Sequence, residues 1–254
     1  MINPLLDLSN PFSTVSGNYQ HARYDGLYWL KLIMVVMGLA TGSVSLSNQA
    51  SAQIQIADET TELPDFKAYE TGLDAAYAGD YVTALREFTI AAEAGLHLAQ
   101  YNLGVMYFSG EGVPQDYALA YKWTRMAAEQ GHINAQFNLG TLFYNGLGMR
   151  SDVFTSWPLL LIFKQSNFEE ALRWYANAAE YDHGEAQYNL ATMYEQGEGV
   201  AQDLVMATMW ARLAHDNEVS DATVLYNSLN ARLSNEQQNT AGRLYAEWVL
   251  KFRG

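Results

Sequence analysis

The 254-residue sequence contains no cysteine. Without thiols the chain cannot form disulfides, use a thiolate nucleophile, ligate zinc through sulfur, or carry the lipid that bacterial lipoproteins attach to cysteine. Cysteine-free chains occur in every compartment, so this absence excludes chemistry but does not indicate a location.

Basic residues are also scarce. The chain has 14 Lys and Arg against 28 Asp and Glu, a formal net charge of −14, and no run of basic residues. A chain without a basic stripe lacks the electrostatic footprint that phosphate backbones require, and an anionic membrane surface would repel it. We therefore expect no nucleic-acid partner, and the charge fits either a basic partner or simple solubility.

Catalytic signatures are missing as well. The sequence has no Gly-x-Ser-x-Gly, Ser-x-x-Lys, His-Glu-x-x-His or P-loop motif. His132 and His183 occupy the same position of an internal repeat, just after a predicted helix, which is typical of turn residues. Successive loops of stacked helices lie about 10 Å apart, too far for two such histidines to share a metal. The sequence thus predicts no catalytic residue, no metal and no cofactor.

The N-terminal region has the order of a secretory signal peptide. Arg23 and Lys31 precede the apolar run Leu32–Ala40, and small residues follow up to an Ala-Ser-Ala sequence that ends at Ala52. This order predicts cleavage after Ala52 and a periplasmic or secreted protein. The alternative is an uncleaved inner-membrane anchor, because the apolar segment 27–46 is nearly long enough to span a bilayer.

The main signal is an internal repeat. The hexapeptide Ala-Gln-Tyr-Asn-Leu-Gly at 99–104 recurs in similar form at 135–140 and 186–191, and a Gly-x-Gly triplet recurs at 110–112, 146–148 and 197–199. Both markers have intervals of 36 and then 51 residues. Two markers with the same intervals indicate a repeat architecture with an insertion of 15 residues in the second unit.

Each unit is predicted to form two helices. Leu103 and its equivalents Leu139 and Leu190 lie in apolar patterns with a spacing of four, which places them on one helical stripe. Gly104 and Gly140 beside the stripe predict close helix approach, and the Gly-x-Gly triplet is expected to end the first helix. The predicted N-caps of the second helices are Asp116, Asn167 and Asp203.

The resulting pattern resembles the Sel1-like repeat family, relatives of the tetratricopeptide proteins. The resemblance rests on Ala99, Leu103, Gly104 and Tyr107, on the triplet with Val113, and on the ending from Trp123 to His132. It implies an all-α solenoid of stacked antiparallel helix pairs with a C-terminal capping helix. It also implies a protein that contacts other proteins. Relatives linked to β-lactam or peptidoglycan binding are cysteine-rich, so that part of the resemblance fails here.

These patterns divide the chain into a leader, a linker and a solenoid. The predicted segments are 1–52 for the leader, 53–65 for the linker, and 66–248 for the solenoid, with units 66–98, 99–134, 135–185 (insertion 153–167) and 186–221 and a cap at 222–250. The unit at 66–98, which precedes the three units that carry both markers, has a tight turn in place of the glycine triplet and resembles a plain tetratricopeptide hairpin. In the cap, Ser234 is expected to begin the last helix, with Gln237 at the capping-box position.

Two sets of residues are candidates for partner binding. The first is an amide row beside the apolar stripe of the first helices, on the concave face of the solenoid: Gln100, Asn102, Gln136, Asn138, Gln187 and Asn189. These amides could instead bond between repeats and hold the superhelix together. The second set lies in the insertion, which we expect to be an exposed loop with Trp157, Leu160 and Phe163. This loop could instead fold back onto the second helices.

The sequence therefore predicts a non-catalytic scaffold of the cell envelope that binds another protein or peptide and no small-molecule cofactor. A cell-wall-directed hydrolase or peptidoglycan-binding protein is the alternative. A membrane association is expected only if the leader stays attached.

Overall fold

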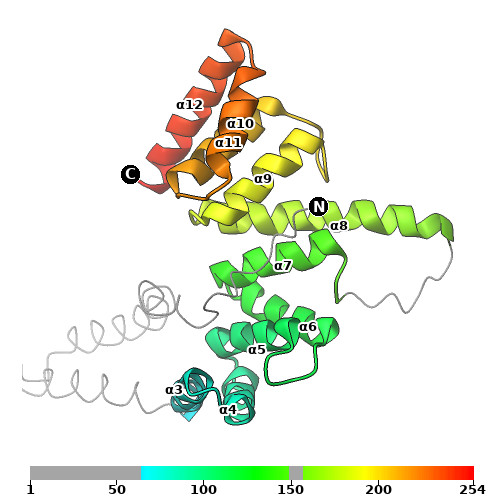
Figure 1. The fold of residues 1–254 in the computed structure, drawn as a ribbon, viewed down its shortest axis with the longest axis vertical. Coiled ribbons are helices and arrows are strands. Elements are labelled where there is room, and N and C mark those ends of the chain that lie inside the picture. Colours follow the sequence, from blue (N-terminus) through cyan, green and yellow to red (C-terminus); the bar gives the residue numbers. More distant parts are fainter. Residues whose placement is uncertain (1–63, 149–156) are drawn as a thin grey trace, which may run out of the picture. The chain divides into compact units, whose positions relative to one another are not determined.

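The computed structural model describes residues 64–148 and 157–254, with side chains from residue 66 to 148 and from 167 onward. The predicted leader, its cleavage site after Ala52, the linker and residues 149–156 lie outside the described residues. Within the described ranges every regular element is a helix, as the repeat predicts. Figure 1 shows these helices as α3 to α12.

The described residues fall into two compact units, which we treat separately. Residues 64–96 form the hairpin of α3 (Pro64–Tyr77) and α4 (Tyr81–Glu93). Asp80 in the tight turn accepts a hydrogen bond from the backbone N–H of Thr83 at 3.1 Å and so begins α4. Tyr69 and Phe88 are buried between the two helices, at a ring distance of 5.9 Å.

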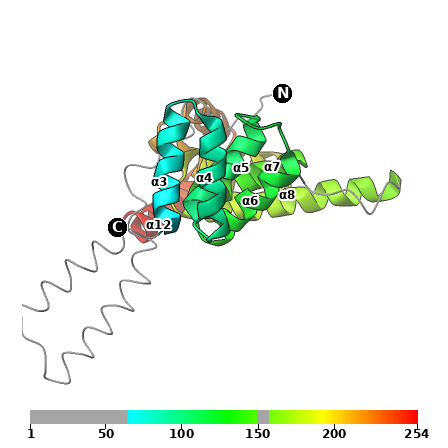
Figure 2. The same ribbon diagram turned by 90° about the horizontal axis from the view of Figure 1, so that it is seen from below.

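Residues 97–254 form the larger unit, in which each of the first six helices packs against the next one, and the last helix packs against the sixth. Its helices are α5 (His97–Ser109), α6 (Tyr117–Glu129), α7 (Ile133–Asn145), α8 (Trp157–Glu180), α9 (Gly184–Gln196), α10 (Leu204–Asp216), α11 (Ala222–Ala231) and α12 (Asn235–Phe252). Figure 2 shows the same helices from a second direction. The first, second and third repeats are the pairs α5–α6, α7–α8 and α9–α10.

Local chemistry sets most helix ends where the sequence places them. The side chains of Asp116 and Asp203 each accept two backbone N–H bonds, at 2.9 and 3.0 Å, and begin α6 and α10. Gly146 and Gly197 end α7 and α9 in the left-handed conformation that glycine adopts without strain. Ser234 and Gln237 form the predicted capping box at the start of α12.

The apolar stripe is the core of the larger unit. Leu103, Leu139 and Leu190 are at most 1% exposed. Gly104 and Gly140 permit close approach as predicted: a Cβ at Gly104 would lie 2.4 Å from Oγ1 of Thr124, and one at Gly140 would lie 2.7 Å from the ring of Tyr175.

The insertion departs from the expectation. Residues 157–167 do not form a loop between two helices, because α8 is one continuous helix of 24 residues from Trp157. Asn167 therefore lies inside α8, and its predicted role as an N-cap is wrong. Pro158 fits this start, since proline is tolerated in the first turn of a helix. Residues 153–156, the start of the predicted insertion, lie outside the described residues.

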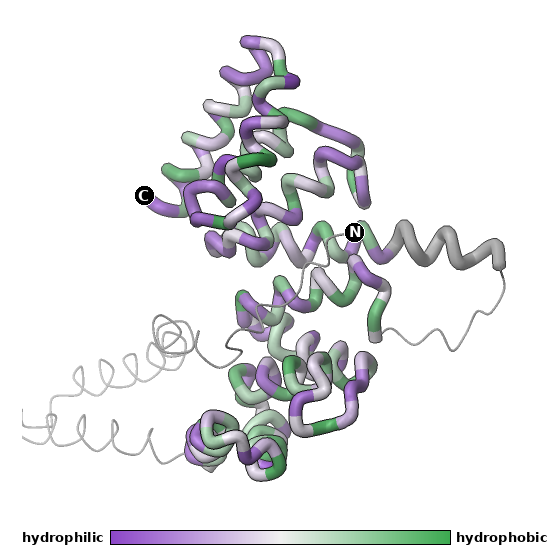
Figure 3. The backbone as a smooth tube through the Cα atoms, viewed as in Figure 1, coloured by the Kyte–Doolittle hydropathy of each residue, from purple (hydrophilic) through white to green (hydrophobic). Residues whose placement is uncertain are grey.

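None of the helices in the described ranges has the length and apolar character needed to cross a bilayer. Figure 3 shows polar and apolar residues mixed along the parts of the helices that it colours. The polar outer face of α12 follows the expectation for the terminal helix of a solenoid, with Trp248 buried on its inner side.

Candidate functional site

The amide row lies inside the larger unit. Five of its six side chains are at most 7% exposed, and Asn189 is half-buried. The five buried members are Gln100, Asn102, Gln136, Asn138 and Gln187. Eight consecutive residues are buried in both α5 and α7, so these first helices present few side chains to a partner at this level.

The glutamines of the row bond between helices. Nε2 of Gln136 donates to the carbonyl of Ala128 at 3.4 Å, and Nε2 of Gln187 donates to the carbonyl of Ala179 at 3.3 Å. Each bond joins the first helix of one repeat to the end of the preceding repeat. The contacts therefore agree with the alternative in which the amides hold neighbouring repeats together.

The other end of the amide is bonded within the repeat. Oε1 of Gln100 accepts from Nε2 of Gln130 at 2.7 Å, and Oε1 of Gln187 accepts from Nδ2 of Asn217 at 2.9 Å. Gln130 and Asn217 are the C-cap residues of α6 and α10. In the third repeat, Gln187 near the start of α9 thus hydrogen-bonds to residues at the ends of both α8 and α10.

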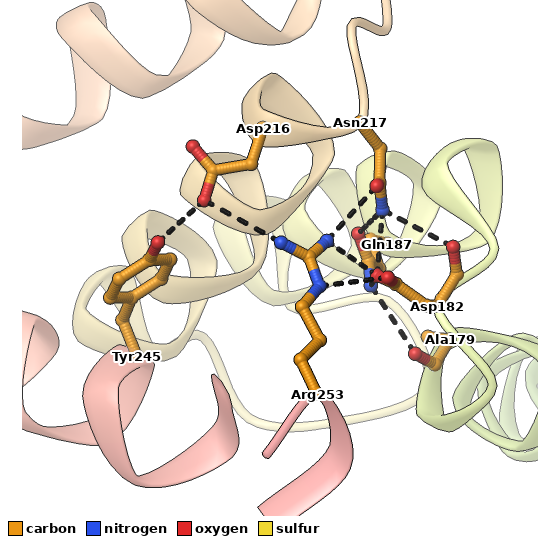
Figure 4. A network of polar contacts seen from close by, with 7 residues as sticks. All are labelled: Ala179, Asp182, Gln187, Asp216, Asn217, Tyr245 and Arg253. Atoms are coloured by element: carbon orange, nitrogen blue, oxygen red, sulfur yellow. Dashed lines mark hydrogen bonds and ion pairs between the residues drawn. The ribbon is translucent and has the colours of Figure 1, made fainter. Parts of the chain in front are cut away.

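A larger polar network surrounds Gln187 (Figure 4). Asp182, in the turn between α8 and α9, accepts two hydrogen bonds from the guanidinium of Arg253 at 2.6 and 2.7 Å. Its Oδ1 also accepts from Gln187 at 3.0 Å and from Asn217 at 2.8 Å. Arg253 follows α12, so the network ties the end of the chain to a turn 71 residues earlier.

The backbone at Asp182 is itself unusual. Its φ is +64°, in the left-handed region that costs a non-glycine residue free energy, and the equivalent residue of the first repeat is Gly131 at φ +85°. An aspartate at this position supplies the carboxylate that glycine lacks. Burial raises the pKa of Asp182, but the hydrogen bonds from Arg253, Asn217 and Gln187 outweigh it and hold the pKa below its ordinary value.

Tyr245 and Asp216 extend the network. The Tyr245 hydroxyl donates to Oδ2 of Asp216 at 2.6 Å, and this bond together with burial raises the pKa of Tyr245. The guanidinium of Arg212 lies 3.8 Å from the centre of the Tyr245 ring, which is a cation–π contact. Because the Asp182 carboxylate is saturated with donors from the protein, the geometry is that of a structural clamp. A general base needs a free acceptor facing a substrate.

The histidines have a role that the sequence interpretation missed. His132 and His183 lie in the predicted turns, but each is the N-cap of the next helix: Nδ1 accepts the backbone N–H of Ala135 at 3.2 Å and of Ala186 at 3.3 Å. The available signal was the equal spacing of each histidine from the following Ala-Gln pair. Over the part of the chain that the structure describes, no group of three His, Asp or Glu side chains could hold a metal ion.

The side chains of Trp157, Leu160 and Phe163 lie outside the described residues, although these positions belong to α8. Their role in binding stays a prediction. The helix that carries them is 11 residues longer than α7 and α9, each of 13 residues. At a rise of about 1.5 Å per residue, α8 is about 16 Å longer than either neighbour.

Comparison with known proteins agrees with the repeat. The Sel1 repeat family matches residues 97–132, 133–154, 162–183 and 184–217. No curated protein matches the sequence. A Sel1 repeat protein from Oxalobacter formigenes is similar in structure, with 23% identity, a TM-score of 0.55, and coverage of 82% of this chain and 83% of that one.

A protective antigen of uropathogenic Escherichia coli with an SLR fold also matches. It has 24% identity and a TM-score of 0.44, and the match covers 74% of this chain. The chain spans 46% of the length of the antigen. At these identities the Oxalobacter protein is evidence for the fold alone.

Proposed function

We propose that this protein is a non-catalytic scaffold that binds another protein in the cell envelope. The chain belongs to the Sel1 repeat family, whose members generally mediate contacts between proteins, and its repeats lie within residues 97–217. The polar groups that a catalytic reading would use are engaged inside the fold. Gln187 and Arg253 both donate to Asp182, and His132 and His183 cap helices.

The observation that carries this proposal is the length of α8. Its additional 11 residues exceed what a 13-residue neighbour can cover, and they contain the apolar sequence from Trp157 to Phe163. An amphipathic or apolar helix beyond the end of a helix stack is a common docking element for proteins. The docking element is therefore the first half of α8, in place of the amide row.

The test is capture of partners from envelope extract by the full chain and by a triple variant, Trp157→Gln, Leu160→Gln and Phe163→Gln. A matched control is the double variant Val224→Gln and Leu250→Gln, because these side chains are 72% and 75% exposed on α11 and α12. We expect the triple variant to lose partners that the control retains, with equal helical content by circular dichroism. Identical partner lists for all three proteins would remove α8 from the proposal.

The envelope location depends on the leader. We propose that the chain is exported and cleaved after Ala52, which leaves a protein that begins at Gln53. Mass measurement of the protein recovered from cells tests this directly. An intact N-terminus in the membrane fraction would indicate the anchored alternative, and turnover of peptidoglycan fragments by the purified protein would contradict a non-catalytic role.

A further inference from the structure

The turn between the first and second repeats is built on a buried histidine. His132 is 3% exposed, and its ring stacks on Tyr101 of α5 with a centroid distance of 4.4 Å and an interplanar angle of 17°. Its Nδ1 accepts the backbone N–H of Ala135 and so caps α7. One side chain thus joins the first helix of one repeat to the first helix of the next.

The next turn repeats the arrangement. His183 caps α9 through Nδ1 and stacks on Phe137 of α7 at 4.6 Å and 21°. The other described helices with a side-chain N-cap in this unit, α6, α10 and α12, use Asp116, Asp203 and Ser234. Histidine is therefore the cap at both turns that connect one Sel1 repeat to the next.

This use of histidine has a chemical condition. A backbone N–H can only donate, so Nδ1 must carry no proton for the cap to exist. Protonation would place a second donor against that N–H and a positive charge at the positive end of the helix dipole. We propose that His132 is an acid-sensitive joint between the first two repeats, with His183 as a weaker copy at the following turn.

The surroundings of His132 disfavour a positive charge. His97 on α5 lies edge-on at a ring distance of 5.4 Å, so a charge on one ring opposes a charge on the other. Glu129 near the end of α6 is exposed and bonded to Arg125 at 2.7 Å, and α7 contains no charged residue. Burial, followed by His97, lowers the pKa of His132 to about 3.

The surroundings of His183 differ in one respect. Glu185 on α9 places Oε2 at 3.4 Å from Nδ1 of His183, where it favours the charged ring. At the end of α8, Glu180 is exposed and Asp182 is bonded to Arg253. Burial still lowers the pKa of His183, but Glu185 opposes it, so we expect a smaller acid effect at this joint.

The sign of the pH effect follows from the lowered pKa. An unfolded histidine takes up its proton near pH 6.5, whereas folded His132 stays neutral until about pH 3. The contribution of His132 to stability is thus fully present above pH 6.5 and is lost as the pH falls toward 3. Between pH 7.5 and pH 5 this one group should raise the unfolding equilibrium constant about 30-fold.

The experiment is denaturant unfolding of the full chain at pH 7.5 and pH 5.0, for the wild type and three variants. His132→Asn and His183→Asn retain an N-cap acceptor but do not titrate, and His215→Asn changes an exposed histidine of α10 as a control. We expect His132→Asn to reduce the pH-dependent change in the unfolding constant by about 30-fold, His183→Asn to reduce it less, and His215→Asn to leave it as in the wild type. A wild-type pH dependence in His132→Asn would overturn the proposal.

Loss of the stacked ring could prevent His132→Asn from folding, so a second measurement uses the wild type. The imidazole ¹⁵N signals of the folded protein at pH 5 should show His132 with an unprotonated Nδ1. A charged His132 ring in the folded protein at pH 5 would equally overturn the proposal.

Discussion

The second and third repeats place the same glutamine in different surroundings. In the third repeat, Gln187 bonds to Ala179, Asp182 and Asn217. In the second repeat, Oε1 of Gln136 is buried and has no hydrogen-bond partner among the described residues. The two repeats therefore share a sequence motif but differ in how well its polar atoms are satisfied.

The difference originates at the C-cap of the second helix. The first and third repeats have Gln130 and Asn217 there, and both donate an amide hydrogen to the glutamine of their own repeat. The second repeat has Tyr181 at this position, which is 67% exposed and has no amide to donate. A buried acceptor without a partner costs about 1–3 kcal/mol, so the repeat with the insertion is the less saturated one.

The difference between the two repeats is tested most directly by making the same substitution in both. Gln187→Leu should reduce the free energy of unfolding by about 3 kcal/mol, because it removes the three hydrogen bonds that Gln187 makes with Ala179, Asp182 and Asn217, each worth about 1 kcal/mol. Gln136→Leu should be nearly neutral, since it removes an acceptor that is already unsatisfied and one long bond. Urea unfolding of both variants measures the difference, and equal losses would contradict it.

A second contrast lies at the glycine of the stripe. Gly140 faces the ring of Tyr175, which is 1% exposed and bonded through its hydroxyl to Thr141 at 3.1 Å. The equivalent positions of the third repeat hold Ala191 and Ala211, which lie in one apolar cluster. The second repeat thus pairs a small residue with a large one, whereas the third repeat pairs two small residues.

Gly140→Ala should therefore cost about 2 kcal/mol, because the added methyl group meets a ring that cannot move away. The same substitution in a Tyr175→Ala background should be stabilising by up to about 1 kcal/mol, since alanine is the better helix former and the ring is gone. Thermal or urea unfolding of the four proteins in this double-mutant cycle gives the coupling. A coupling near zero would show that the two residues do not constrain each other.

The sequence predicted those features that a local rule determines. The 36-residue period, the helix ends at Asp116, Gly146 and Asp203, and the burial of Leu139 follow from spacing, capping and glycine conformation. The insertion misled because Asn167 with a glutamate three residues later has the pattern of a capping box. Nothing in that pattern excludes a helix that starts ten residues earlier, at Trp157, with Pro158 in the first turn, where proline is tolerated.

The candidate site was less predictable because its contacts are not local. The periodic amides left both a partner and a neighbouring repeat open, and their burial and hydrogen bonds agree with the neighbouring repeat. Arg253 lies beyond the last repeat and contacts a turn 71 residues away, so no period could reveal it. The clamp is part of the reason why the third repeat is the more saturated one.

Removing the hydrogen bonds of Arg253 should leave the polar groups of the third repeat less well satisfied, as they are in the second repeat. Arg253→Gln should cost about 1 kcal/mol, a modest value because the side chains of Arg253 and Asp182 are 28% and 36% exposed. Asp182 has a lowered pKa, so its contribution is present above the ordinary aspartate value and is lost at lower pH. The effect of the substitution should therefore be larger at pH 7 than at pH 3.

Arg243→Gln is the matched control for this substitution, because Arg243 pairs with Glu247 on the exposed face of α12. An exposed pair of this kind contributes little to stability. If the two arginine variants unfold at the same denaturant concentration, the clamp does not distinguish the third repeat.

The smallest expected effect comes from giving the second repeat the amide donor that it lacks. Tyr181→Gln places in the second repeat the residue type that the first repeat uses at this position, where Gln130 reaches the glutamine of its own repeat at 2.7 Å. The new amide should satisfy Oε1 of Gln136 and raise the free energy of unfolding by about 0.5–1 kcal/mol. Because Tyr181 is largely exposed, little apolar burial is lost in exchange. The gain should vanish in a Gln136→Leu background. A gain that persists there would come from the change at the protein surface and not from a hydrogen bond to Gln136.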